Sequence, residues 1–217
     1  MADVFTKYLT TKNLAHSDFQ TFHSKITSEK DDDRDLYAAP QNQLDLLEFQ
    51  NDSNVRIFCW ILTSPATRNK TIAVHDTWAK RCDGYVFISS EEDAEFHVVN
   101  ASLPEGRDYL WGKTKFALGH IYNNTLKDYD WFLKADDDTF VIMENLRRFL
   151  SNYSHADPLY FGCQFSPFTP QGYMSGGAGY VLSREAVRLF VEEGLAKGVC
   201  RTDDAGDALI RSWHVSL

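Results

Sequence analysis

The sequence lacks a long hydrophobic run: in its 217 residues there is no stretch of about 18 consecutive apolar side chains. A helix that crosses a bilayer needs about 20 such residues, so we expect no membrane span in this chain. Residues 1–20 are also too polar to contain the apolar segment of a signal peptide.

Basic residues are in deficit. The chain has 22 Lys and Arg against 31 Asp and Glu, which gives a net charge of −9, and no basic stripe is present. Proteins that bind nucleic acid non-specifically need such a stripe, so we expect no nucleic-acid partner. An anionic substrate would therefore need local positive charge, for example from a metal ion.

Cysteine is scarce, with four residues in all. Cys59 and Cys82 flank one expected strand–helix unit, and we predict that they form a disulfide in an oxidising compartment. Four cysteines allow three pairings, and we assign no state to Cys163 and Cys200. Five Asn-x-Ser/Thr sites occur where roughly one is expected by chance, at Asn51, Asn69, Asn100, Asn123 and Asn152. Both features indicate the secretory pathway, although no targeting segment is visible, and we therefore expect this chain to be a shortened form of a longer protein.

The most informative stretch is 131–138, in which an apolar run ends in three consecutive carboxylates, Asp136, Asp137 and Asp138. The apolar run predicts a buried strand, and ligands bind at the carboxyl ends of strands in open α/β sheets. Three adjacent anions repel each other and need a cation nearby. Carboxylates at alternate positions, Asp136 and Asp138, suit Mn²⁺ or Mg²⁺, which would bridge a diphosphate. The alternative is a solvated acidic turn, which is how we interpret residues 31–33, where no strand precedes.

Strand and helix patterns alternate after residue 54. We predict strands at 55–63, 85–88, 96–99, 131–135, 159–162 and 180–182, and helices at 67–81, 108–129, 142–150, 183–191 and 200–217. This order predicts an α/β fold, a three-layer α/β/α sandwich with a mostly parallel central sheet. Residues 1–54 are polar and weakly periodic, and we interpret them as a stem or partly ordered lead-in to a single domain at 55–217.

Residues 171–182 are rich in glycine. Glycine permits positive φ and lets a ligand lie against bare backbone, so this stretch is suited to contact a sugar or a diphosphate. It lacks the Lys-Ser/Thr of a phosphate-binding P-loop. A tight turn without a ligand is the alternative. The acidic triplet likewise does not match a calcium-binding loop, because no Gly and terminal Glu follow it at the required spacing.

Residues 131–140 and 172–183 together resemble the core 1 β1,3-galactosyltransferase family, inverting enzymes related to the Fringe glycosyltransferases. Residues 59–63, 77–82, 89–92 and 105–108 are similar to that family in the same order. The resemblance implies a GT-A fold, a UDP-galactose donor and a Mn²⁺ ion held by the Asp-x-Asp element. It also implies the Golgi lumen and, as acceptor, the 3-hydroxyl of N-acetylgalactosamine O-linked to a glycoprotein or glycopeptide. A homodimer is compatible with it.

Residue by residue, the resemblance assigns the metal to Asp136 and Asp138, with Asp138 as the direct ligand. Gly176, Gly177 and Ala178 match the glycine-rich segment of the family. The donor site that the resemblance implies contains carboxylates, bare backbone and one lysine: Asp136, Asp137, Asp138, Gly176, Gly177 and Lys113. In the family, a histidine late in the domain completes the metal site, and no histidine of this chain lies at the matching position. The resemblance therefore implies that the domain continues beyond residue 217.

An inverting transferase also needs a base, and metal-bound Asp136 and Asp138 would face the diphosphate rather than the acceptor. The family places an acidic pair further along, where this chain has Asp203 and Asp204, so we predict that Asp204 or Asp203 is the catalytic base and that Asp207 is a weaker candidate. The alternative is that this acidic cluster is the solvated start of a helix. The alternative function is that of a catalytically silent relative that acts as a folding partner or chaperone for the active enzyme.

Overall fold

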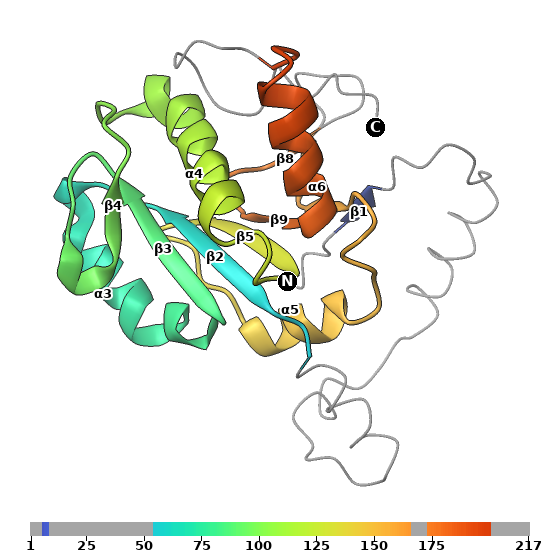
Figure 1. Ribbon diagram of the computed structural model, residues 1–217. Coiled ribbons are helices and arrows are strands. Elements are labelled where there is room, and N and C mark those ends of the chain that lie inside the picture. The colour runs from blue at the N-terminus through green and yellow to red at the C-terminus, as the bar shows by residue number, and fades with distance from the viewer. Residues whose placement is uncertain (1–5, 9–53, 166–172, 201–217) are drawn as a thin grey trace, which may run out of the picture.

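The computed structural model describes residues 6–8, 54–165 and 173–200. Its centre is a seven-stranded sheet with the strand order β1-β6-β9-β5-β2-β3-β4 (Figure 1). The strands are β1 (Thr6–Tyr8), β2 (Ile57–Leu62), β3 (Gly84–Ser89), β4 (Val98–Asn100), β5 (Trp131–Asp136), β6 (Tyr160–Gly162) and β9 (Tyr180–Ser183). A separate two-stranded sheet pairs β7 (Gln164–Phe165) with β8 (Tyr173–Met174).

Most strands of the large sheet run in one direction. β2 is parallel to β3 and β5, and β3 is parallel to β4. β9 is antiparallel to both β5 and β6, so β6 runs with the parallel group, and β1 is antiparallel to β6. The described sheet is therefore mostly parallel, as the sequence predicted, and β9 and β1 are its reversed strands.

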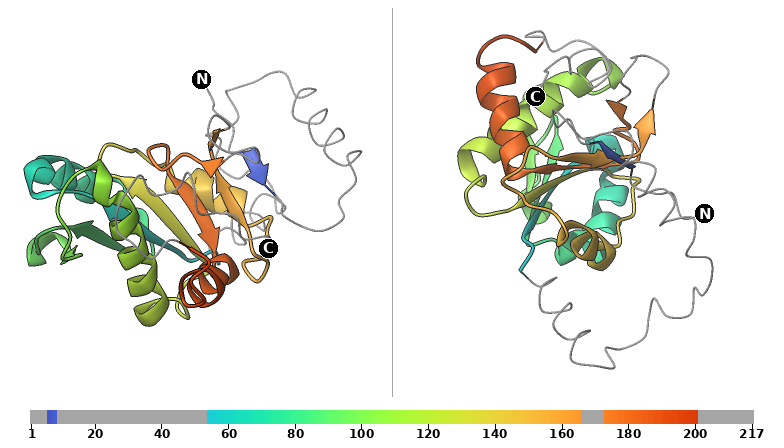
Figure 2. Two further views of the ribbon diagram at one scale, coloured as in Figure 1. Left: turned by 90° about the horizontal axis from the view of Figure 1, so that it is seen from above. Right: turned by 90° about the vertical axis from the view of Figure 1, so that its right-hand side faces the viewer.

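Helices cover both faces of the sheet (Figures 1 and 2). On one face lie α4 (Leu110–Asn124) and α6 (Arg184–Leu189), which continues as a π-helical segment over Phe190–Leu195. On the other face lie α3 (Arg68–Thr77) and α5 (Met143–Leu150). This three-layer arrangement is consistent with a GT-A-like fold and confirms the predicted fold class. No helix in the described part of the chain is both long and apolar enough to cross a bilayer.

β2 shows why the sheet is buried on both faces. All six of its side chains are buried, and they alternate between the two cores because successive residues of a strand point to opposite faces. The core under α4 and α6 takes Phe58, Trp60 and Leu62. The core under α3 and α5 takes Ile57, Cys59 and Ile61. A continuous apolar run is thus what this position in the sheet requires.

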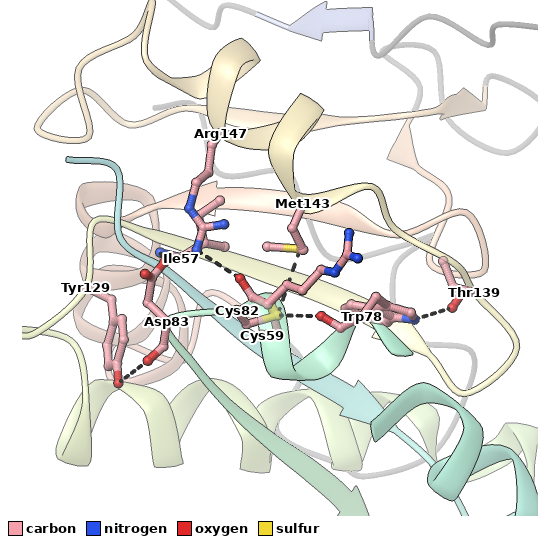
Figure 3. Close-up of a disulfide and its surroundings, with 10 residues drawn as sticks. Ile57, Cys59, Trp78, Cys82, Asp83, Tyr129, Thr139, Met143 and Arg147 are labelled. Carbon is pink, nitrogen blue, oxygen red and sulfur yellow. Dashed lines mark hydrogen bonds and ion pairs between the residues drawn. A yellow bond between two sulfur atoms is a disulfide. The ribbon is translucent and has the colours of Figure 1, made fainter. Parts of the chain in front are cut away.

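The predicted disulfide is present and joins Cys59 in β2 to Cys82, which follows the α3 unit (Figure 3). The two Cα atoms lie 6.2 Å apart across 23 residues of sequence. The next residue, Asp83, accepts a hydrogen bond from the backbone N–H of Ile57 at 2.7 Å and one from Arg147 at 2.7 Å. The bridge and these bonds hold the end of the α3 unit against the start of β2. Cys163 and Cys200 are free cysteines.

Some predicted boundaries were wrong. The strand expected at 96–99 begins at Val98, because Ala94–Phe96 forms a 3-10 turn and His97 has a φ of 56°, which interrupts an extended run. The helix expected over 108–129 is α4 at Leu110–Asn124, and a 3-10 turn precedes it. A hydrogen bond of 2.9 Å from the Thr125 N–H to the Ile121 carbonyl closes its last turn.

Other elements were not anticipated. β7 and β8 are too short to give a period in the sequence. β1 lies inside the expected lead-in, where it pairs with β6.

The body of the helix expected at 67–81 is α3, and a 3-10 turn flanks it at Pro65–Thr67 and again at Ala79–Arg81. The helix predicted at 200–217 lies outside the described residues.

Candidate active site

The acidic triplet stands where the strand order of the sheet reverses. After β2 the chain builds β3 and β4 on one side, and then returns to build β5 on the other side of β2. In open α/β sheets, ligands bind in the crevice at the carboxyl ends of strands at such a point. Leu62 and Asp136, the last residues of β2 and β5, are register partners. The three carboxylates therefore begin at the position that this topology favours for a ligand.

Asp136 is paired within the protein. Lys134, which is 4% exposed, donates from Nζ to an Asp136 carboxylate oxygen and also to the Gly176 carbonyl oxygen at 2.8 Å. A buried lysine is unfavourable unless its charge is paired, so this contact satisfies both groups. Lys134 was not among the predicted site residues, although a lysine inside an otherwise apolar strand is a signal that a carboxylate lies nearby.

Asp137 faces the interior. Its side chain is 11% exposed, and its carboxylate accepts hydrogen bonds from the hydroxyls of Thr63, at 2.9 Å, and Thr67. Thr63 in turn lies 2.6 Å from the Thr71 hydroxyl. The donor role predicted for Asp137 stays a prediction, because the described contacts use this carboxylate to join the end of β5 to the segment after β2.

Asp138 projects into solvent, with a side chain that is 66% exposed. Lys70 in α3 approaches it to 3.4 Å and also lies 3.8 Å from Asp137. Lys70 and Lys134 together offset two of the three negative charges of the triplet. These two lysines thus reduce the repulsion between the adjacent carboxylates. The exposed carboxylate of Asp138 is the one best placed to meet a ligand.

A glycine turn lies against the strand that carries the triplet. Gly179 has a φ of +83°, which favours glycine, and a Cβ there would lie 3.0 Å from the Lys134 carbonyl oxygen. Its N–H bonds the Gly176 carbonyl at 3.1 Å and closes the turn. The turn therefore requires glycine at 179 because of both its conformation and its close approach to β5.

The same turn is held next to the first carboxylate. A Cβ on Gly177 would lie 4.0 Å from Asp136 Oδ2, and the Gly177 carbonyl accepts a hydrogen bond from the Thr139 hydroxyl at 3.1 Å. Trp78 Nε1–H donates to the Thr139 carbonyl at 3.0 Å (Figure 3). The structure thus brings together two stretches that are about 40 residues apart and that sequence analysis selected independently.

Lys113 reaches the same edge of the sheet from α4. It is 2% exposed, and its Nζ donates to Glu105 at 2.5 Å and to the Thr63 carbonyl at 3.5 Å. Glu105 also accepts from the Ser90 N–H at 3.0 Å. Thr63 is therefore shared: its carbonyl contacts Lys113 and its hydroxyl contacts Asp137. The donor role of Lys113 stays a prediction, and its partner Glu105 was not among the predicted site residues.

Tyr180 lies behind the triplet, in register with Lys134. Burial raises the pKa of Tyr180 well above its usual value, and nearby Tyr160 and Asp136 raise it further. The Tyr180 hydroxyl is therefore less acidic than that of a solvent-exposed tyrosine.

The donor set is suited to a hard cation. Asp136 and Asp138 supply two carboxylates, and Mg²⁺ or Mn²⁺ commonly binds through one or two carboxylates plus substrate phosphates. Within residues 6–8, 54–165 and 173–200, no group of three or more His, Cys, Asp or Glu side chains could hold a metal ion. A metal ion held by Asp136 and Asp138 therefore stays a prediction. The other predicted site residues lie outside the described ranges: Asp203, Asp204 and Asp207.

Known proteins resemble this chain over the same region. It is 49% identical over 148 residues to glycoprotein-N-acetylgalactosamine 3-beta-galactosyltransferase 1 of Xenopus laevis, an alignment that covers 68% of this chain and 41% of the relative. It is 29% identical over 140 residues to the beta-1,3-glucosyltransferase of Mus musculus, covering 63% and 28%. It is 26% identical over 141 residues to chondroitin sulfate synthase 3 of Homo sapiens, covering 57% and 16%. The chain spans less than half of the length of each of these relatives.

A family match covers most of the chain. Residues 55–206 match the Fringe-like family, a region that includes the acidic triplet and the glycine turn. It also includes the predicted bases at Asp203 and Asp204. The chain therefore belongs to the Fringe-like family, as the resemblance in its sequence predicted.

Proposed function

We propose that this chain carries the catalytic domain of a metal-dependent, inverting β1,3-galactosyltransferase. The proposed donor is UDP-galactose, and the acceptor is the 3-hydroxyl of N-acetylgalactosamine O-linked to a glycoprotein. One observation supports this most strongly: the acidic triplet lies at the reversal point of the sheet, against the glycine turn. The 49% identity to a galactosyltransferase supports the choice of sugar and acceptor.

In this proposal, the residues described above bind the donor. Asp136 and Asp138 would hold Mn²⁺, which when bound supplies positive charge to a diphosphate leaving group. Lys113 lies at the same edge, where it pairs with Glu105, and we propose it as a donor-side residue. The turn at Gly176 and Gly177 exposes backbone to the sugar, because no side chain intervenes.

The reaction is a single displacement. The acceptor 3-hydroxyl oxygen forms a bond to C1 of galactose while the bond between C1 and the phosphate oxygen breaks, and UDP leaves. The hydroxyl proton passes to a carboxylate on the side opposite UDP, for which we propose Asp204 or Asp203. One base is sufficient because no covalent glycosyl-enzyme forms.

The disulfide between Cys59 and Cys82 is typical of oxidising compartments and supports a site of action in the secretory pathway, which we propose to be the Golgi lumen.

A catalytically silent folding partner finds no support among these relatives, each of which is named as a transferase or a synthase.

Calorimetry with UDP tests the donor site. UDP should bind more tightly with Mn²⁺ than with EDTA, and Asp138→Asn should remove that gain while circular dichroism stays unchanged. Asp128→Asn is the matched control, because Asp128 is also exposed but follows α4, away from the triplet. Equal UDP affinity with Mn²⁺ and with EDTA in the unaltered chain would refute the proposed metal site.

Galactose transfer tests the base separately. Asp204→Asn should retain Mn²⁺-dependent UDP binding and lose transfer to a GalNAc-bearing peptide. If transfer persists in Asp204→Asn and also in Asp203→Asn, the assignment of the base is wrong. Because UDP binding is measured in parallel, loss of the base can be distinguished from loss of the donor site.

A further inference from the structure

Two of the Asn-x-Ser/Thr sites lie at the edge of the sheet opposite the triplet. α4 begins near the carboxyl end of β2, where Lys113 contacts Thr63, and it ends at Asn124, shortly before β5 starts. Asn123 is therefore near the amino ends of the strands. α5 likewise follows the triplet and runs back, so that its end lies at the same edge (Figure 1).

The position of Asn152 is supported by its neighbours. Ser151 and Tyr153 line a cavity together with Arg56 and Trp131, which stand at the start of β2 and of β5. Asn152 lies between these two lining residues and is exposed. Asn54, which precedes β2, lines the same cavity. The chain therefore enters β2 at this edge.

Both asparagines have the exposure that an attached sugar requires. Asn123 is exposed in the last turn of α4, and Asn152 is exposed just after α5. The amide nitrogen of Asn152 donates to the Arg148 carbonyl at 2.9 Å and to the Phe149 carbonyl at 3.4 Å. N-glycosylation replaces one of the two amide hydrogens, so the remaining N–H can still donate to a carbonyl at the helix end.

The other two described sites differ. Asn69 is next to Lys70, which pairs with Asp138. The third residue of its site, Thr71, is 2% exposed, and its hydroxyl lies 2.6 Å from that of Thr63. Asn100 ends β4 at the carboxyl edge, is only half-exposed, and accepts a hydrogen bond from the Ser102 N–H at 2.6 Å. Glycans at these sites would stand beside the proposed donor crevice.

We propose that Asn123 and Asn152 carry N-linked glycans. The donor is a lipid-linked oligosaccharyl diphosphate: the asparagine amide nitrogen bonds to the anomeric carbon, the bond from that carbon to the diphosphate oxygen breaks, and the lipid diphosphate leaves. The amide proton passes to a base of the membrane transferase. Sugars at these two positions cover the edge where the chain enters the fold and leave the carboxyl edge open to a nucleotide sugar.

Mass spectrometry tests the assignment. The full chain, directed into microsomes by a cleavable leader, is treated with a peptide amidase that converts glycosylated Asn to Asp in heavy-oxygen water. The peptides that contain positions 123 and 152 should both carry heavy Asp. An unmodified peptide at either position, in translocated protein that has formed the Cys59–Cys82 bridge, would overturn the proposal.

Variants provide a second readout on gels. Asn123→Gln and Ser154→Ala should each remove one step of the amidase-sensitive mobility shift. Asn124→Gln is the matched control, because it changes an exposed neighbour and keeps the Asn-x-Thr pattern at 123. A shift that both variants leave unaltered would overturn the proposal. None of these outcomes depends on galactose transfer, so they stand apart from the test of the proposed function.

Discussion

The hydroxyl of Thr63 donates a hydrogen bond of 2.9 Å to the carboxylate of Asp137, and so joins the ends of β2 and β5 where the strand order reverses. Thr67 donates to the same carboxylate. The three carboxylates of the triplet therefore have different surroundings: the middle one binds the protein, and the last one faces solvent. This division predicts different effects of substitution at neighbouring positions.

Asp137→Ala should lower the free energy of unfolding by about 1–3 kcal/mol, because hydrogen bonds to a charged, nearly buried group are lost. Asp138→Ala, at an exposed position, should change it by less than about 0.5 kcal/mol. Urea denaturation followed by tryptophan fluorescence measures both. Equal urea midpoints for the two variants would contradict a structural role for Asp137.

Gly179→Ala should destabilise the fold by about 1 kcal/mol or more, because φ is +83° and a Cβ would lie 3.0 Å from the Lys134 carbonyl. Gly119→Ala is the matched control: this residue lies within α4, and apart from its own helix backbone and chain neighbours nothing lies within 4 Å of a Cβ built there. That change should stabilise the protein by roughly 0.5–1 kcal/mol. Thermal unfolding of both variants checks the opposite signs.

The double variant Cys59→Ala, Cys82→Ala should lose about 2–4 kcal/mol of stability, since the unfolded chain is no longer cross-linked across 23 residues. Cys163→Ser is the control, because Cys163 is free and only half-buried. Dithiothreitol should lower the unfolding midpoint of the unaltered protein and of Cys163→Ser, and should leave that of the double variant unchanged. A midpoint that reductant does not alter in the unaltered protein would show that the bridge does not stabilise the fold.

Arg188 gives a prediction on pH. Its guanidinium donates to both oxygens of Glu185, at 2.8 and 2.6 Å, and these hydrogen bonds lower the pKa of Glu185. A carboxylate whose pKa is lower in the folded state stabilises the fold above its unfolded pKa, and this contribution is lost as pH falls through the folded pKa.

The unaltered protein should therefore lose stability more steeply below about pH 4.5 than Arg188→Gln does. The difference in stability should shrink in 1 M salt. The electrostatic screening length there is about 3 Å, and the pair is partly exposed to solvent. Lys127→Gln, at an exposed lysine, is the control. Parallel acid profiles for the unaltered protein and Arg188→Gln would contradict the prediction.

Much of the fold could be predicted from the sequence because burial leaves a local pattern. A continuous apolar run at 55–63 indicated a strand covered on both faces, and all side chains of β2 are buried. The apolar run before Asp136 indicated a strand that ends at a ligand edge. Short elements such as β7 and β8 left no pattern, since two residues cannot display a period.

The partners of the site residues were decided by the tertiary structure alone. Thr63 and Asp137 are 74 residues apart, and Lys134 and Gly176 are 42 apart, so no local spacing could show that they touch. Parallel strands bring their carboxyl ends to one edge, and the order β5-β2-β3 selects which ends become neighbours. The sequence by itself determined that three carboxylates follow a buried strand. Which carboxylate faces inward and which faces solvent depended on the hydroxyls and lysines that the folded sheet carries to them.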